Sequence, residues 1–295
     1  EASRHVPSIA SSLRGIGYQN IFLYGGDSQF DNMQGFAIAN GYDKVIDRDD
    51  LPNSLPGTMW GIFDNHVFDY AIDQLNRATS PLQLTLFTTT NHQPWEYPES
   101  YKTKIPDFSK EKFRKGQVHQ TMNYVDQVLG EFMEKARNSS WFDNTIFVFV
   151  ADHSLTVYRD NYEDLRNGHI PLVIYAPDIL TESVRIKKPV SQVDILPTLF
   201  GIIGYSEEFT AMGRDVLMND GAFASLVSND NLIWYEDDHL YTEILGQRST
   251  FNRIDNFPGM AMTAIKPENP SFGLYQNRFR SYLQTAFTQL KSFGE

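Results

Sequence analysis

The sequence predicts an α/β protein in which helices flank a mostly parallel sheet and a small antiparallel subdomain follows. Over residues 1–205, short apolar runs alternate with amphipathic segments, which is typical of β/α units. After about residue 206 this alternation stops, and residues 231–245 have the pattern of two strands joined at Asp237 and Asp238. We therefore expect an α/β core over 1–205 and, over 206–295, an antiparallel subdomain that ends in a helix.

The expected strands are short apolar runs bounded by turn residues. One ends at Gly25 and Gly26, and another runs directly into Asp152. Continuous apolar runs of this kind are typical of strands that are buried on both faces of a parallel sheet. The strands are expected at 20–24, 82–90, 145–151 and 170–177.

The expected helices have apolar residues at helical spacing. In the segment 61–78, for example, Phe63, Val67, Ala71 and Leu75 share one face. Local signals mark helix ends, since Ser191 can cap a helix start and Gly41 can stop one. The helices are expected from Pro7 to Gly15 or Gly17, and at 30–42, 61–78, about 109–137, 191–204 and about 272–292.

Composition excludes several classes of function. The net charge is −12 without a basic stripe, which argues against a nucleic-acid partner. The absence of cysteine rules out disulfides, thiolate metal sites and cysteine nucleophiles. No apolar run approaches the roughly 18 residues of a transmembrane helix. The first residues have the pattern of a helix and not of a signal peptide, so we expect a piece of a longer protein.

Polar residues follow the expected strands at the edge where ligands of open α/β sheets gather. Three histidines are among them, each from a separate segment. Asp27 and Ser28 follow the strand 20–24, and Asn91 and His92 follow 82–90. Asp152, His153 and Ser154 follow 145–151, and His169 precedes 170–177.

The neighbouring pair Asp152 and His153 is the strongest candidate for metal chemistry. A rigid strand delivers a carboxylate and an imidazole together, as a divalent cation requires, and a cation would compensate a buried carboxylate. The alternative is structural: Asp152 caps the next loop and His153 is a core histidine with satisfied hydrogen bonds. His92, after another strand, favours the metal interpretation.

The motifs "TIFVFVADHS", "TTTNHQPW", "GHIPLVIYAP" and "SQVDILPTLFGIIGY", in this order, resemble the sulfatase-like branch of the alkaline phosphatase superfamily. The pattern is most similar to the lipoteichoic acid synthase and phosphoglycerol transferase group. The segments 17–47 and 212–217 fit the same group. This resemblance implies an alkaline-phosphatase-like fold and an enzyme that acts on phosphate or sulfate esters.

The resemblance also implies roles for the candidate residues. Asp152 and His153 would bind one divalent metal, which could be Mn, Mg, Zn or Ca. His92 would contact the transferred phosphate or sulfate, or protonate the leaving group. Asn91 would join it in substrate binding, and His169 would be a second histidine near the anion. The metal would activate a threonine, serine or formylglycine nucleophile.

Two departures from the family pattern qualify these expectations. The nucleophile and an early acidic ligand of the family lie upstream of the matched segment, and in "HVPSIASSLRG" His5 stands where a sulfatase nucleophile would be, with Ser8 expected in a helical turn. We therefore expect a truncated domain with half a metal site, inactive alone. Tyr24, Asp31 and Met33 replace the His, Trp and Arg that recognise glycerol phosphate, so another phospho- or sulfo-substrate on a glycan or lipid is an equal alternative.

The resulting hypothesis is a fragment of an extracytoplasmic enzyme, periplasmic or at the cell surface, anchored in the membrane by upstream helices. One rival is a noncatalytic domain that binds a glycan or lipid headgroup through the loop aromatics Trp95 and Tyr97. Another is a phosphomutase-like enzyme for small soluble phosphates. The site hypothesis requires Asp152, His153 and His92 to lie within about 10 Å of one another, since metal–ligand bonds are short.

Overall fold

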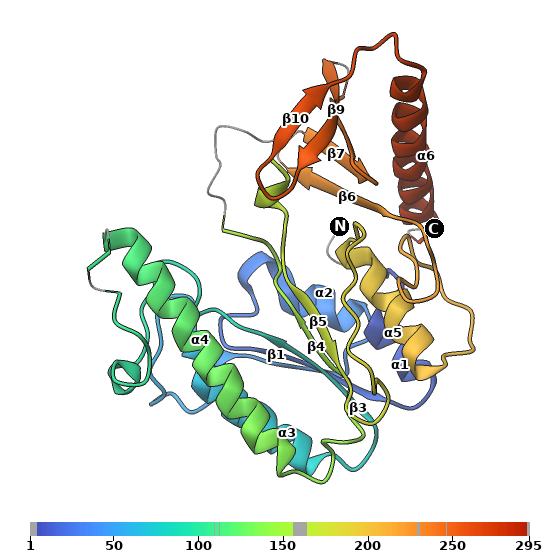
Figure 1. Cartoon of the computed structure of the whole chain (residues 1–295). Helices are drawn as coiled ribbons and strands as arrows, with labels where there is room; N and C mark the ends of the chain where they lie inside the picture. Colours follow the sequence, from blue (N-terminus) through green and yellow to red (C-terminus); the bar gives the residue numbers. More distant parts are fainter. Residues whose placement is uncertain are drawn as a thin grey trace. The chain divides into compact units, whose positions relative to one another are not determined.

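A computed structural model describes residues 5–108, 110–111, 113–155, 164–228, 231–245 and 247–293. The chain forms two compact units, residues 1–145 and 146–295 (Figure 1). The domain boundary expected at 205/206 stays a prediction.

The first unit contains a three-stranded parallel sheet in the order β2-β1-β3. Strand β1 (Gln19–Tyr24) is central and pairs with β2 (Lys44–Ile46) and β3 (Leu82–Phe87). Ile21 and Leu23 of β1 are buried, as its apolar run predicts. Because the strands are parallel, the segments after Tyr24 and Phe87 leave the sheet at the same edge.

Helices and short 3₁₀ turns connect these strands. Helices α3 and α4 pack side by side (Figure 1), and α4 contributes Tyr124 and Val128 to a buried cluster with Tyr101 and Ile105. The expected start of the long helix near Ser109 lies outside the described residues. The bounds are α1 (Ile9–Gly15), η1 (Phe30–Asn32), α2 (Met33–Ala39), η2 (Arg48–Asp50), α3 (Asp64–Arg77), η3 (Glu99–Tyr101) and α4 (Phe113–Arg137).

The second unit begins with β4 (Phe147–Val150) and β5 (Leu172–Tyr175), which pair antiparallel. The chain between them turns back through η4 (Leu165–Asn167), so that Val150 faces Leu172. Strand β4 is also less buried than its apolar run suggests, since Val150 is 43% exposed. Helix α5 (Ile195–Ile203) follows η5 (Gln192–Asp194), where Ser191 forms the predicted cap as a capping box with Asp194.

The rest of the second unit is a five-stranded antiparallel sheet in the order β10-β9-β8-β7-β6. The predicted hairpin is confirmed as β7 and β8, which turn at Asp237 and Asp238. The other three strands were not anticipated. The bounds are β6 (Phe223–Ser228), β7 (Asn231–Glu236), β8 (His239–Ile244), β9 (Arg248–Asn256) and β10 (Ala261–Ala264).

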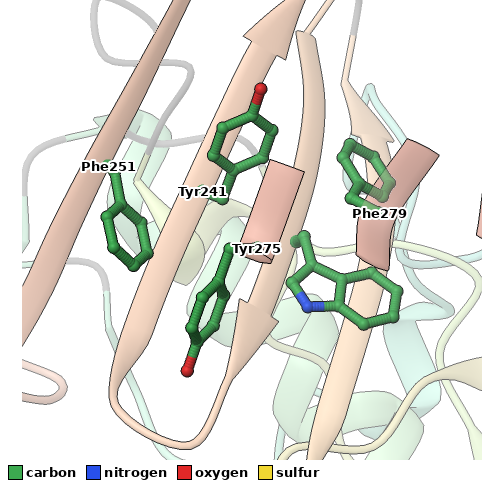
Figure 2. Packing of buried hydrophobic residues seen from close by; sticks show 5 residues of the cluster. Tyr241, Phe251, Tyr275 and Phe279 are labelled. Carbon is green, nitrogen blue, oxygen red and sulfur yellow. The ribbon is translucent and has the colours of Figure 1, made fainter. Parts of the chain in front are cut away.

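The terminal helix α6 (Pro270–Ser292) runs along this sheet (Figure 1). Figure 2 shows Tyr275 and Phe279 of the helix beside Tyr241 and Phe251 of the strands. Phe279 is 1% exposed and Tyr241 is fully buried, so the aromatic cluster is a core and not a ligand surface. The parallel sheet with flanking helices and the C-terminal antiparallel part together confirm the predicted fold class.

Candidate functional site

A close backbone crossing shapes the end of β1. The amide of Ile62 donates a hydrogen bond to the carbonyl of Gly25 at 2.8 Å. A Cβ atom on Gly26 would lie 2.5 Å from the carbonyl oxygen of Trp60, and one on Gly61 would lie 2.5 Å from the carbonyl oxygen of Gly25. Only glycines permit this approach, which brings Trp60 to the edge where β1 ends.

The loop after β3 is fixed by Asp64, the first residue of α3. Its Oδ1 accepts hydrogen bonds from the amides of Thr89 at 3.1 Å and Thr90 at 3.2 Å. In return, the Thr90 hydroxyl oxygen accepts a hydrogen bond from the Asp64 amide at 3.1 Å. Asp64 is fully buried, and this burial raises the pKa of its carboxyl group although the hydrogen bonds from Thr89 and Thr90 oppose the shift.

His92 and Asn91 follow this anchored segment directly, and both are exposed. The imidazole of His92 lies on the indole of Trp60, with ring centroids 3.9 Å apart and planes at 50°. Its Nδ1 is 3.1 Å from the carbonyl oxygen of Gln93. In the tautomer in which Nδ1 donates to that carbonyl, Nε2 carries no proton and is an acceptor.

The Asp-His pair is located in the second unit, just after β4. Both side chains are exposed, that of Asp152 to 52% and that of His153 to 76%, so the interpretation of His153 as a core histidine is wrong. Asp152 Oδ1 accepts the His153 amide at 2.7 Å, and Asp152 Oδ2 lies 3.4 Å from His153 Nε2. A carboxylate oxygen and an imidazole nitrogen therefore lie within reach of one cation.

His169 lies at the same end of the β4–β5 pair as Asp152 and His153. The antiparallel register places the residues that follow Val150 beside those that precede Leu172. The Ser154 hydroxyl bonds to the carbonyl oxygen of Asn167, two residues before His169, and joins the two segments. The His169 ring itself packs edge-on against Phe257, with centroids 5.1 Å apart.

The metal donors found so far form a pair and not a complete site. Among the described residues, no group of three or more His, Cys, Asp or Glu side chains could hold a metal ion. The chemistry of Asp152 and His153 fits a divalent metal, with further ligands required from elsewhere. The proximity of His92 to this pair stays a prediction. No described helix is long and apolar enough to cross a membrane.

The structure also shows the environments of several other residues that the sequence analysis singled out. Ser8 is the N-cap of α1 and forms a capping box with Ser11, which agrees with a structural serine. Tyr24 is 3% exposed, and its burial, followed by the charge of Asp27, raises its pKa. Trp95 is 9% exposed and Tyr97 stacks on Tyr124, so the expectation that both loop aromatics could serve as an exposed binding surface is wrong.

Asp64 was missed as a candidate because the apolar spacing of the segment 61–78 predicts a single helix that includes it, and Trp60, just before that segment, matches no motif. Asp64 starts that helix three residues later than expected. The signal was a carboxylate in a first helical turn preceded by an aromatic-glycine pair, Trp60 and Gly61.

Comparison with known proteins agrees with this description. The sulfatase family model matches residues 1–205. The lipoteichoic acid synthase-like protein YvgJ of Bacillus subtilis is 24% identical over 250 residues, which cover 79% of this chain and 40% of that protein. Phosphoglycerol transferase I of Xanthomonas campestris pv. campestris is 26% identical over 223 residues, or 70% of this chain and 30% of that protein. The chain thus spans well under half the length of these relatives.

A solved structure supports the same assignment. A protein of the alkaline phosphatase superfamily from Vibrio parahaemolyticus superposes with a TM-score of 0.85 at 25% identity, and the match covers 99% of this chain and 70% of that one. The resemblance inferred from the four motifs is confirmed. Because the matching family model covers more than half of the sequence, this chain belongs to the sulfatase family, within the alkaline phosphatase superfamily.

Proposed function

We propose that this chain is the C-terminal part of the catalytic domain of an extracytoplasmic, metal-dependent enzyme that transfers or hydrolyses phosphate or sulfate esters. The observation that carries the proposal is the exposed pair Asp152 and His153 at the end of β4, with His169 on the adjoining segment. The related lipoteichoic acid synthase-like protein and phosphoglycerol transferase I support ester chemistry of this kind. A structural role for Asp152 and His153 would not require two exposed, mutually oriented side chains.

Each candidate site residue has a defined role in this proposal. Asp152 and His153 hold one divalent metal, which when bound lowers the pKa of a nucleophile and offsets charge on the ester oxygens. His92 presents Nε2 to the ester, to bind the anion or to give a proton to the leaving group. Asn91 adds a neutral donor beside it, and His169 adds a second imidazole near the anion.

The nucleophile and an acidic metal ligand are proposed to lie in a preceding segment of a longer protein, which membrane helices hold at the cell surface or in the periplasm. The chain alone is then expected to bind metal weakly and to show no turnover. Its substrate is a phosphate or sulfate ester on a glycan or lipid. Tyr24 is buried where the synthases have a histidine, so glycerol phosphate is not favoured over other esters.

The test compares metal content and turnover of phosphodiester and sulfate esters in the full-length protein and in this chain. Asp152→Ala should lower turnover of the full-length protein by at least about a hundredfold, since loss of even an outer-shell metal contact costs 10–100-fold. The matched control is Asp238→Ala, which alters a second Asp-His pair, Asp238 and His239, in the β7–β8 turn of the same unit. It should leave metal content and turnover unchanged.

Two results would overturn the proposal. One is full turnover and metal content after Asp152→Ala. The other is the absence of metal and turnover in the full-length protein across a broad screen of metals and esters, which would favour a noncatalytic binding domain.

A further inference from the structure

A buried carboxylate lies beneath the His92 loop without an evident structural need for its charge. Asp64 is fully buried, and its Oδ1 accepts both the Thr89 and the Thr90 amides. Its Oδ2 has no hydrogen-bond partner within the described part of the chain. An unpartnered buried carboxylate oxygen is costly, and burial raises the pKa of this group.

A helix start does not require this arrangement. Serine, threonine or asparagine caps a helix at lower desolvation cost. At α3, moreover, the Thr90 hydroxyl accepts the Asp64 amide at 3.1 Å, and the Tyr124 hydroxyl accepts the Asn65 amide at 3.1 Å. The first amides of the helix are thus satisfied by other groups. The Asp64 side chain instead holds the backbone amides of Thr89 and Thr90, which directly precede Asn91 and His92.

A second contact fixes the same histidine from its ring face. The indole of Trp60 lies 3.9 Å from the His92 imidazole, centroid to centroid, and Phe30 packs edge-on against the indole at 5.9 Å. Trp60 in turn is held by the glycine crossing, since its carbonyl oxygen faces Gly26 and the following Gly61 faces Gly25. The His92 backbone and the His92 ring are therefore restrained from different elements, α3 and the segment that follows β2.

We propose that Asp64 and Trp60 are positioning residues for His92: Asp64 fixes the loop through the Thr89 and Thr90 amides, and Trp60 fixes the orientation of the imidazole. This rests on the role of His92 in the proposed function. In this role neither residue needs to contact the substrate. Together they keep Nε2 of His92 in one place before substrate binds, so that no binding free energy is spent on ordering it.

The kinetic test uses the full-length protein and a double-mutant cycle. Asp64→Ala is expected to lower kcat by about tenfold to a hundredfold while KM stays within about twofold, because a displacement of about 1 Å at a catalytic group has effects of this size. Asp64→Asn keeps an acceptor for both amides and should recover most of the loss. In a His92→Gln background, Asp64→Ala should have little further effect, since the two residues act through one group.

The spectroscopic test uses this chain, which contains both residues and needs no turnover. The ring nitrogens of His92, assigned by comparison with His92→Gln, should give one sharp set of signals. Asp64→Ala and Trp60→Ala should shift or broaden these signals, whereas Asp64→Asn and Trp60→Phe should retain them. The matched control is Asp73→Ala, which removes an exposed carboxylate from the same helix and should change neither the His92 signals nor kcat.

The two arms separate failure of this inference from failure of the proposed function. A full-length protein without turnover contradicts the proposed function, and the His92 signals then decide on positioning alone. Unchanged His92 signals in folded Asp64→Ala and Trp60→Ala overturn the positioning role. Equal losses of kcat from Asp64→Ala in the presence and absence of His92 also overturn it, because they would mean a general effect on stability.

Discussion

The loop after β3 carries His92 and the loop after β4 carries Asp152 and His153, and the two loops are built differently. The first rests on a fully buried carboxylate that accepts hydrogen bonds from two backbone amides, and its histidine packs against a tryptophan with the ring planes tilted by 50°. The second exposes Asp152 and His153, which are oriented mainly by hydrogen bonds to their own neighbours. Contacts with other parts of the first unit therefore fix the β3 loop and the His92 ring. The exposed side chains of the β4 loop, by contrast, remain available for a ligand.

This difference separates two kinds of restraint. Asp64 restrains its loop at the cost of its own desolvation, so its effect should be visible in stability. Asp152 is hydrated, so its effect should be visible in metal binding and turnover and hardly in stability.

The largest stability contrast is expected between Asp64→Ala and Asp152→Ala. Loss of Asp64 leaves the Thr89 and Thr90 amides without their acceptor, and each unsatisfied buried group costs about 1–3 kcal/mol, partly offset by removal of the desolvated carboxylate. We expect a loss of about 2–4 kcal/mol of the free energy of unfolding, against less than about 0.5 kcal/mol for Asp152→Ala. Urea unfolding measures both, and equal losses would contradict the comparison.

The glycine crossing that holds Trp60 should be the next most sensitive feature. Gly61→Ala places a methyl group 2.5 Å from the carbonyl oxygen of Gly25, and overpacking of this kind costs about 1–3 kcal/mol. Gly130→Ala in α4 is the control, because a Cβ there meets no other group within 4 Å and should stabilise the helix by about 0.5–1 kcal/mol. Destabilisation by both substitutions alike would argue against a specific crossing.

The smallest contrast is a pH dependence of opposite sign for two buried aspartates. Burial raises the pKa of Asp64, so its contribution to stability is present below the unfolded pKa of about 3.9 and is lost as pH rises through the folded value. A hydrogen bond from Arg166 lowers the pKa of Asp164, which precedes η4, so its contribution is present above about 3.9 and is lost as pH falls through the folded value.

Unfolding free energies measured from pH 3 to pH 8 check these signs. Asp64→Asn should gain stability relative to the unsubstituted protein as pH rises. Asp164→Asn should lose stability at neutral pH, with a deficit that disappears in acid. Each pKa unit between folded and unfolded states corresponds to about 1.4 kcal/mol. Parallel pH profiles for the two variants would show that the environments of the two carboxyl groups do not differ as described.

Sequence patterns predicted the parts of the fold whose burial is regular. The run 82–90 predicted β3, and the pattern of 231–245 predicted β7 and β8. Strand β9 was missed because only Phe251 and Ile254 of its nine residues are buried, which leaves a mostly polar segment without clear alternation. Trp95 was expected to be a loop aromatic available for binding, yet it is only 9% exposed.

The candidate site was predicted where a residue type itself has the chemistry. Asp152, His153 and His92 are recognisable donors that follow apolar runs. Trp60 and Asp64 act through contacts with the distant residues His92, Thr89 and Thr90, and periodicity alone does not report such contacts. Resemblance to a family supplied the order of the motifs, which local patterns could not supply.

The central claim is that Asp152 and His153 bind the divalent metal. The most direct measurement adds paramagnetic Mn²⁺ to this chain and follows the broadening of the ring signals of His153. The account predicts broadening of His153 that disappears in Asp152→Ala and persists in Asp238→Ala. The absence of broadening at His153, or broadening that survives Asp152→Ala, would contradict this claim.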